Sequence, residues 1–298
     1  MTRSTPLNVS TAQVIAVGVI CSWLLIGYAA LLVYSVAVNG RLDASLWQFD
    51  LVTLLPFAAA GFLAQLIDGS LGMGFGVISN AVMLLLGQPP AVATSSVHTA
   101  EGFASGASAA SHIWYRNVDW RLFAKLVLPG ILGGAIGVTI ITVADAAFTR
   151  PIVLAYLGLI GVALIWRGRR RARSEAAPRL VQPLGFIGGL LDAAGGGAWG
   201  PIVTGNLLIQ GTNPAKVVGT VDVSEFFVTV AVSLMFIATM GALAFTTATL
   251  GLLLGGVAAA PLGALLARRV PSRLLSGAAG TLLLGIAIVA LTRGLPVS

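Results

Sequence analysis

Charged residues are scarce in this sequence. They make up 9% of the 298 residues, whereas 57% are hydrophobic. A soluble domain carries about 25% charged residues because water must solvate its surface. So low a share of charge excludes an ordinary soluble domain and favours an integral membrane protein in contact with lipid. The 37 glycines agree with this interpretation, since small residues let membrane helices approach one another closely.

Cysteine is almost absent, and the basic residues are gathered in few places. The single Cys21 cannot form an internal disulfide. The net charge of +7 comes largely from short clusters between apolar runs, with six arginines from Arg167 to Arg179. Basic loops between membrane segments stay on the cytoplasmic side. The charge therefore indicates loop orientation, and we expect no nucleic-acid partner.

Long apolar runs predict an all-α polytopic membrane protein. The first run, about 12–38, is longer than the ~7–15 residues of a signal-peptide core, so it predicts an N-terminal transmembrane helix. Six further runs approach or exceed the ~20 residues that a helix needs to cross a bilayer. They cover about 91–112, 122–143, 149–166, 215–240, 245–267 and 273–292.

Two regions, 51–87 and 183–210, are interrupted by glycines that follow an aspartate. The pieces on either side run about 12–17 residues, which is short for independent crossings. Irregular backbone at membrane depth is tolerated only where protein or a watery cavity satisfies its N–H and C=O groups. We predict broken or re-entrant helices there. The alternative, in which all four pieces cross fully, stays open.

These two regions are copies of one another. Residues 61–103 align without gaps to residues 185–227, an offset of 124, with 14 identities in 43 positions. The alignment pairs Asp68 with Asp192 and Glu101 with Glu225, which shared apolar composition would not produce. We predict four parts: an N-terminal helix and loop (1–50), a first repeat (51–166), an arginine-rich cytoplasmic loop (167–182) and a second repeat (183–298).

The basic loops also predict how the repeats lie in the membrane. If the loops at 116–125, 167–179 and 268–273 are all cytoplasmic, the two repeats run in opposite directions. The N-terminus is then cytoplasmic, the C-terminus lies outside, and a bacterial inner membrane is the expected location. Inverted repeats are common in secondary transporters, whose binding sites lie at interrupted segments in matching places of both halves.

Acidic residues at membrane depth are the candidates for proton coupling or gating. Glu101 and Glu225 occupy equivalent positions on apolar helices, where an ionised carboxylate costs about 2.5–3.5 kcal/mol. They carry or gate a coupling proton, or else they fix helix packing through hydrogen bonds. Asp68 and Asp192 have either a direct transport role or a helix-capping role at the breaks. Asp222 has either a transport role or a favourable interaction with the macrodipole near a helix start.

Glycine-rich turns followed by helix N-termini favour an anion, because exposed N–H groups and the helix dipole both attract negative charge. A neighbouring helix places hydroxyls and an imidazole on one face; His98 is either an anion or proton contact or a packing residue. The predicted substrate-binding residues are Gly72, Gly74, Ser95, Ser96, His98, Gly195, Gly196 and Gly197.

On these residues the sequence resembles the sulfite exporter TauE/SafE family of permeases. The resemblance covers about 50–292, and it is carried by Gly61-Phe62-Leu63-Ala64-Gln65-Leu66-Ile67-Asp68-Gly69 through Gly76, Pro90-Ala91, Ser95-Ser96-Val97-His98, Gly188 through Gly197, and Pro201. It implies transport of sulfite, sulfonates or other small oxyanions. The first copy departs from a plain triple glycine, reading Leu71-Gly72-Met73-Gly74-Phe75.

We therefore expect a non-enzymatic permease that moves a small oxyanion by alternating access with a coupling proton. We expect no cofactor and no metal, since the stretch from His98 to Glu101 lacks the order and spacing of an HExxH zinc motif. An intramembrane enzyme, a structural subunit, and a channel or cation carrier are the alternatives. The sequence indicates neither the oligomeric state nor the direction of transport.

Overall fold

The computed structural model describes residues 51–71, 73–114, 116–167, 178–210, 214–241, 246–269 and 272–293, with four isolated positions at 26, 29, 30 and 33. The predicted N-terminal helix, apart from those positions, lies outside the described residues. So do Gly72 and residues 168–177 of the arginine-rich loop.

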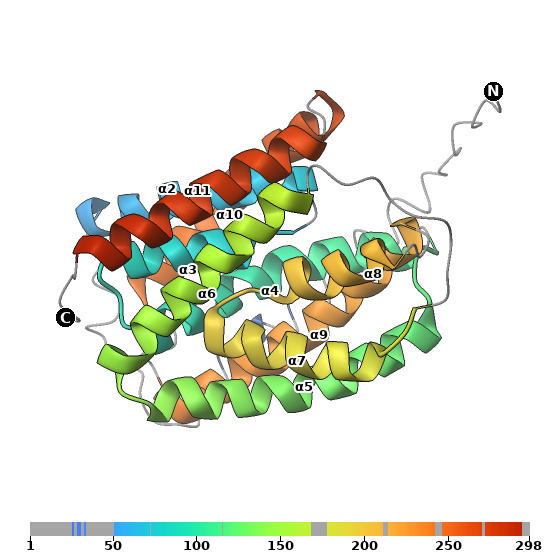
Figure 1. Ribbon diagram of the computed structural model, residues 1–298, viewed down its shortest axis with the longest axis horizontal. Helices are drawn as coiled ribbons and strands as arrows, with labels where there is room; N and C mark the ends of the chain where they lie inside the picture. Colours follow the sequence, from blue (N-terminus) through green and yellow to red (C-terminus); the bar gives the residue numbers. More distant parts are fainter. Residues whose placement is uncertain are drawn as a thin grey trace.

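Every regular element in the described ranges is a helix, as the sequence predicts (Figure 1). The six long apolar runs each form one helix. In chain order the elements are α2 (Leu51–Leu71), α3 (Phe75–Leu85), α4 (Pro90–Trp114), α5 (Trp120–Val143), α6 (Ala146–Arg167), α7 (Val181–Gly195), the π-helical turn η2 (Gly200–Thr204), α8 (Gly205–Ile209), α9 (Pro214–Met240), α10 (Thr247–Arg269) and α11 (Ser272–Arg293).

Five of the described helices are long and apolar enough to cross a membrane: α2, α5, α6, α9 and α11. A helix of 20 residues is about 30 Å long, which matches the hydrocarbon core. α4 has 25 residues but is not among the five, because polar side chains lower its hydropathy. Since most of its polar side chains are buried, α4 is an interior helix that carries polar chemistry.

The broken regions contain short helices as predicted, but most of the predicted lengths need correction. α3 has 11 residues, α7 has 15, and η2 with α8 spans Gly200–Ile209, so these pieces are short. α2, however, continues for 21 residues to Leu71 and is a candidate span on its own. The expected 12–17 residues hold for α7. They were too many for α3 and for the η2–α8 piece, and too few for α2, because α2 continues through Asp68 and Gly69 to Leu71.

The main helix pairs cross between the two halves of the chain. α2 packs along α10, and α7 packs along α5. Shifting by 124 residues relates α2 to α7 and α5 to α10, so one pair is the counterpart of the other. α4 packs along its counterpart α9, and α6 along its counterpart α11 (Figure 1). The contact pattern therefore has the symmetry of the sequence duplication.

Glycines allow these pairs to approach closely. A Cβ built on Gly61 would overlap the backbone of Leu252 in α10, and one built on Gly133 would overlap the backbone of Phe186 in α7. The outward faces of the helices carry exposed apolar side chains such as Leu132 and Leu159, as a lipid-facing surface does.

Candidate functional site

Each broken helix is bridged by its aspartate. Asp192 Oδ1 accepts a hydrogen bond from the backbone N–H of Trp199 at 2.7 Å, and Asp68 Oδ1 accepts one from the backbone N–H of Phe75 at 3.3 Å. Both bonds span seven residues and are related by the 124-residue shift. Each carboxylate therefore satisfies an amide that the break leaves without a helical partner, which is the capping interpretation of these aspartates.

The two breaks touch. A Cβ built on Gly76 would overlap Gly197, and one built on Gly197 would overlap Gly76. Gly196 and Gly197 have φ values of +75° and +94°, which side chains rarely adopt. Asn80 Nδ2 donates to the Gly195 carbonyl at 2.7 Å and joins α3 to the second break. The glycine-rich stretches thus meet as predicted, but their contact is tightly packed.

A buried ion pair joins α4 to the second break. His98 Nε2 lies 3.1 Å from Asp192 Oδ2, and both side chains are at most 1% exposed. His98 Nδ1 lies 2.8 Å from the Thr94 carbonyl. Because a carbonyl only accepts, Nδ1 is the donor in this contact. His98 therefore contacts its own helix through one ring nitrogen and the second break through the other.

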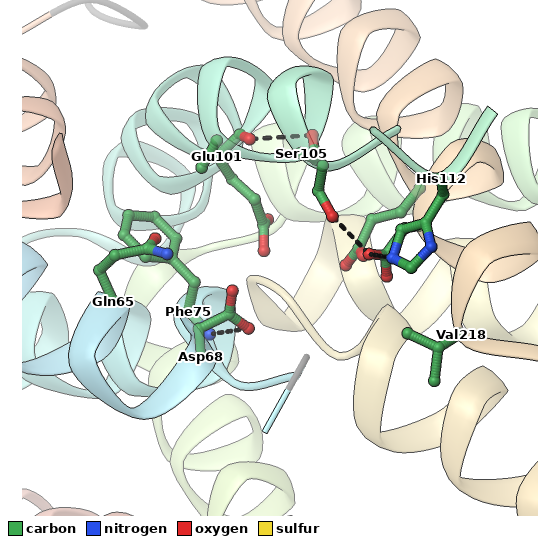
Figure 2. A pocket seen from close by; sticks show the side chains of 11 residues that line it. Gln65, Asp68, Phe75, Glu101, Ser105, His112 and Val218 are labelled. Atoms are coloured by element: carbon green, nitrogen blue, oxygen red, sulfur yellow. Dashed lines mark hydrogen bonds and ion pairs between the residues drawn. The ribbon is translucent and has the colours of Figure 1, made fainter. Parts of the chain in front are cut away.

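A cavity of about 260 Å³ lies beside the first break, between α2, α4 and α9 (Figure 2). Four carboxyl groups line it: Asp68, Glu101, Asp222 and Glu225. Its other lining residues are Gln65, Phe75, Ala104, Ser105, Ser108, His112 and Val218. No lysine or arginine is among these described lining residues. Four of the five acids predicted for proton coupling therefore share one cavity, although their assignment to that role stays a prediction.

Glu101 projects from α4 into the cavity, between Gln65 and Asp68 on one side and His112 and Val218 on the other (Figure 2). Its side chain is 7% exposed, and its Oε2 atom has no hydrogen-bond partner in the described structure. The Oε1 atom of Gln65 is likewise buried without a partner. Two buried polar atoms that lack partners at a cavity indicate a site for a ligand, a proton or water.

The other end of the cavity is more accessible. Ser108 Oγ donates to Asp222 Oδ2 at 2.6 Å, and His112 Nε2 lies 3.3 Å from the same oxygen. His112 is 24% exposed, compared with 7% for Glu101. The end of the cavity at which His112 lies is therefore more exposed than the place where Glu101 lies. Within the described ranges, no three His, Cys, Asp or Glu side chains are arranged to share a metal ion.

None of the described residues that were predicted to bind substrate lines this cavity. Ser95 Oγ donates to the Val92 carbonyl, and Ser96 Oγ lies 3.3 Å from Thr246 Oγ1. His98 pairs with Asp192, away from the cavity. Gly74 and the glycines at 195–197 belong to the breaks themselves. The described glycines and His98 therefore lie at or against the breaks, whereas four of the five predicted acids line the open space next to them.

Sequence reasoning missed Gln65 and His112 as cavity residues. For His112 the signal was available, since it continues the spacing of Glu101, Ser105 and Ser108 on one face of α4. Gln65 precedes Asp68 by three residues on α2, so it lies on the same face as that aspartate. Its counterpart in the second repeat is Gly189, so the duplication gave no hint of a polar role.

Comparisons with known proteins agree with this architecture. Residues 57–290 match the model of the family described as sulfite exporter TauE/SafE. The chain is 38% identical over 231 residues to a protein of Bacillus subtilis (strain 168) named "Probable membrane transporter protein YtnM", an alignment that covers 74% of this chain and 77% of the relative. No solved structure matches.

The apolar helices, the crossed pairing and the buried polar cavity define a polytopic helical membrane protein of the transport class. The chain belongs to the sulfite exporter TauE/SafE family. Family and relative together indicate a membrane transporter of the TauE/SafE type.

Proposed function

We propose that this protein is a proton-coupled secondary transporter for small oxyanions of the sulfite or sulfonate kind, which works by alternating access. The observation that carries the proposal is the cavity beside the first break. Glu101 comes from the first half of the chain and Glu225 from the second, and both line it. A space of about 260 Å³ is several times the ~30 Å³ share of one water molecule, so it accommodates a small hydrated anion.

Proton coupling follows from the charge of the cavity. An oxyanion cannot approach four ionised carboxylates without strong repulsion, which at 4 Å is about 4 kcal/mol per pair at an effective dielectric constant of 20. A protonated carboxyl group, in contrast, donates an O–H to an oxyanion. Anion binding therefore requires proton binding at Glu101 and Glu225, so the anion and the protons cross the membrane together.

Neutral and basic groups provide the remaining contacts in the proposal. Ser105, Ser108 and the amide of Gln65 are donors that line the cavity, and His112 lies at its accessible end. The predicted residues around the breaks, such as Gly197 and His98, act in the proposed cycle when the packed contact between Gly76 and Gly197 loosens. We propose that membrane lipid surrounds the outer faces and that no further partner is required for flux.

The test is flux in proteoliposomes against sulfite, thiosulfate and a set of sulfonates, with and without a pH gradient. We expect flux of at least one oxyanion to rise when the gradient is imposed. Glu101→Gln and Glu225→Gln should each abolish this dependence. Asp145→Asn is the control, since Asp145 is an exposed acid just before α6 that does not line the cavity. Normal pH-dependent flux in both glutamine variants would refute the proton role.

A cationic substrate is the second candidate, and the same four carboxyl groups favour it. Ionised, they attract a cation without any proton. The sign of the current distinguishes the two: cation uptake carries positive charge inward, whereas an oxyanion with one proton per charge carries none. Saturable cation current with no oxyanion flux would replace the first proposal by the second.

A further inference from the structure

The open cavity has a counterpart elsewhere in the molecule. α4 and α9 begin at Pro90 and Pro214, which are 124 residues apart, so the register of the duplication holds along both helices. Adding or subtracting 124 therefore converts each cavity residue into an equivalent one. Val218, Asp222, Asp68, Phe75, Ser105 and His112 correspond in this order to Thr94, His98, Asp192, Trp199, Thr229 and Phe236.

This counterpart is completely sealed. All six of its side chains are at most 1% exposed. Related sequence positions thus enclose an open space in one half of the molecule and a solid core in the other.

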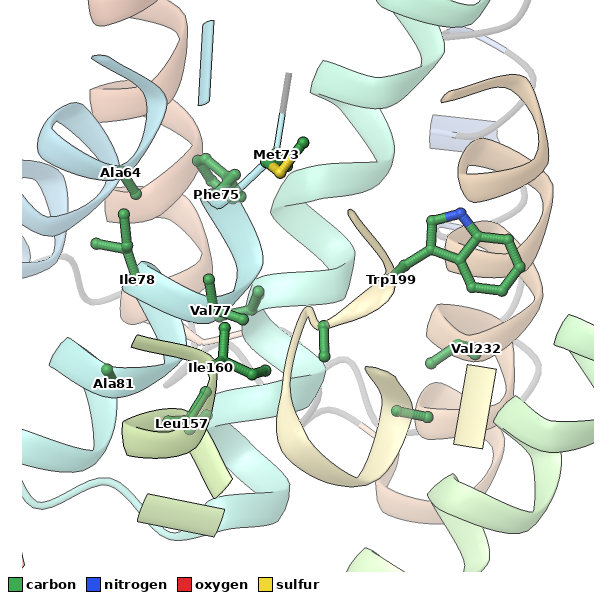
Figure 3. Packing of buried hydrophobic residues seen from close by; sticks show 14 of the residues in the cluster. Ala64, Met73, Phe75, Val77, Ile78, Ala81, Leu157, Ile160, Trp199 and Val232 are labelled. Atoms are coloured by element: carbon green, nitrogen blue, oxygen red, sulfur yellow. The ribbon is translucent and has the colours of Figure 1, made fainter. Parts of the chain in front are cut away.

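Two aromatic side chains fill the sealed half. Trp199 replaces Phe75 and packs against the glycine faces of α5 and α7, where a Cβ on Gly130 or Gly188 would meet its ring. Phe236 replaces His112, and its ring lies 6.0 Å from that of His98. Figure 3 shows Trp199 and Val232 within this core, on the far side of the break from Phe75.

The sealed half nevertheless contains polar groups suited to a ligand. The Thr229 hydroxyl, which corresponds to cavity residue Ser105, is buried with no hydrogen-bond partner in the described structure. His98 takes the place of Asp222, so a basic group stands where the open cavity has an acid. Glu101 and Glu225 correspond to each other, and they are therefore common to both halves.

We propose that Thr94, His98, Asp192 and Thr229 form a second substrate chamber, closed here by Trp199 and Phe236, which opens on the opposite face of the membrane when the first cavity closes. It takes the same small oxyanion, with His98 as its cationic contact and the Thr229 hydroxyl as a donor. This inference rests on the proposed function. It assigns residues to the part of the transport path that leads to the opposite membrane face, which the open cavity does not reach.

Cysteine accessibility tests the chamber, because the chain has one native cysteine. In a Cys21→Ser background, Ser105→Cys and Thr229→Cys form a matched pair at equivalent positions. A membrane-impermeant thiol reagent is applied to each face of proteoliposomes, with and without a small sulfonate, which does not react with the reagent. We expect Ser105→Cys to react from the face on which His112 lies. Thr229→Cys should react only from the opposite face, several-fold faster with the sulfonate present.

A second arm needs no substrate. Trp199→Ala removes the larger aromatic side chain and should increase labelling of Thr229→Cys from the opposite face several-fold, while Ser105→Cys keeps its own side. Size-exclusion chromatography checks that this variant is folded. Should Trp199→Ala unfold the protein, the measurements with and without the sulfonate decide alone.

The outcomes separate the two proposals. If Thr229→Cys reacts from the same face as Ser105→Cys, or stays unreactive in vesicles that show flux of the sulfonate, the second chamber is refuted and the transport function stands. If wild-type vesicles carry no oxyanion at all, the proposed function fails, and labelling in the Trp199→Ala arm still decides whether the chamber exists.

Discussion

Asp192 Oδ1 accepts a hydrogen bond from the backbone N–H of Trp199 at 2.7 Å, and Oδ2 of the same carboxylate contacts His98 Nε2. One side chain therefore closes the break between α7 and η2 and ties that break to α4. The equivalent Asp68 also caps its break, at 3.3 Å, but faces the cavity. The capping aspartate is therefore buried in the second break, whereas in the first break it also lines the cavity.

The difference predicts unequal costs for removing the two aspartates. Asp192→Ala should lower the free energy of unfolding by more than Asp68→Ala, because it leaves a buried amide without an acceptor and also removes the partner of His98. A hydrogen bond to a charged group contributes about 1.5–3 kcal/mol. Thermal unfolding in detergent measures both variants. Equal shifts would contradict the assignment of Asp192 as the stronger cap.

The buried pair of His98 and Asp192 should show energetic coupling. Removing one partner of a buried ion pair costs about 3–5 kcal/mol, because it leaves the other charge uncompensated. We expect the double variant His98→Ala with Asp192→Asn to be less destabilised than the sum of the two single variants, by about 0.5–3 kcal/mol. Additive effects on unfolding in a double-mutant cycle would show that the two side chains are independent.

The contact between the two breaks should tolerate no side chain. Gly76→Ala places a methyl group on the Gly197 backbone, which no flexible side chain can relieve. We expect loss of folded protein or a large drop in melting temperature. Gly285→Ala is the control, since its Cβ would meet nothing within 4 Å; alanine there should stabilise α11 by up to about 1 kcal/mol. A normal melting temperature for Gly76→Ala would contradict the close approach.

Removing the imidazole at the accessible end of the cavity should weaken substrate entry. His112→Gln keeps a polar side chain but cannot carry a positive charge, so we expect a higher KM for oxyanion flux and a smaller change in the maximal rate. Arg121→Gln, which removes a positive charge from an exposed site that does not line the cavity, serves as the control. Identical KM values for the two variants would exclude His112 as a contact for the anion.

The amide of Gln65 should matter because it is buried at the cavity without a partner for its oxygen. Gln65→Leu has a similar size but no donor, so we expect reduced oxyanion flux with little change in thermal stability. Gln182→Leu makes the same substitution at an exposed position of α7 and should not affect flux. Unchanged flux in Gln65→Leu would remove this residue from the site.

Much of this architecture could be predicted, because membrane helices are long apolar runs and a duplication is visible as matching aspartates, prolines and glutamates. Glu101 and Glu225 were found on that basis, and they share the cavity. The sequence could not show that Asp68 lines open space while Asp192 is buried against His98. That difference depends on how the helices of the two halves pack. A comparison of equivalent positions in a duplicated sequence does not show which half contains the open cavity and which half is closed.

The extent of α2 was mispredicted for a related reason. Asp68 and Gly69 suggested an interruption, yet the helix continues to Leu71 because the aspartate satisfies an amide seven residues ahead while remaining helical itself. Helix-breaking residues therefore indicate the approximate region of an interruption but not its exact position, since a side chain can cap an amide several residues away along the chain.

The crossed pairing of α2 with α10, and of α7 with α5, has a consequence for biogenesis. When synthesis has reached the end of α6, α10 has yet to emerge from the ribosome, and α10 is the long helix along which α2 packs in the described residues. α2 therefore remains in lipid, or beside an insertion factor, until nearly the whole polypeptide is made. Two fragments divided at the arginine-rich loop should accordingly mature only when both are produced in the same cell.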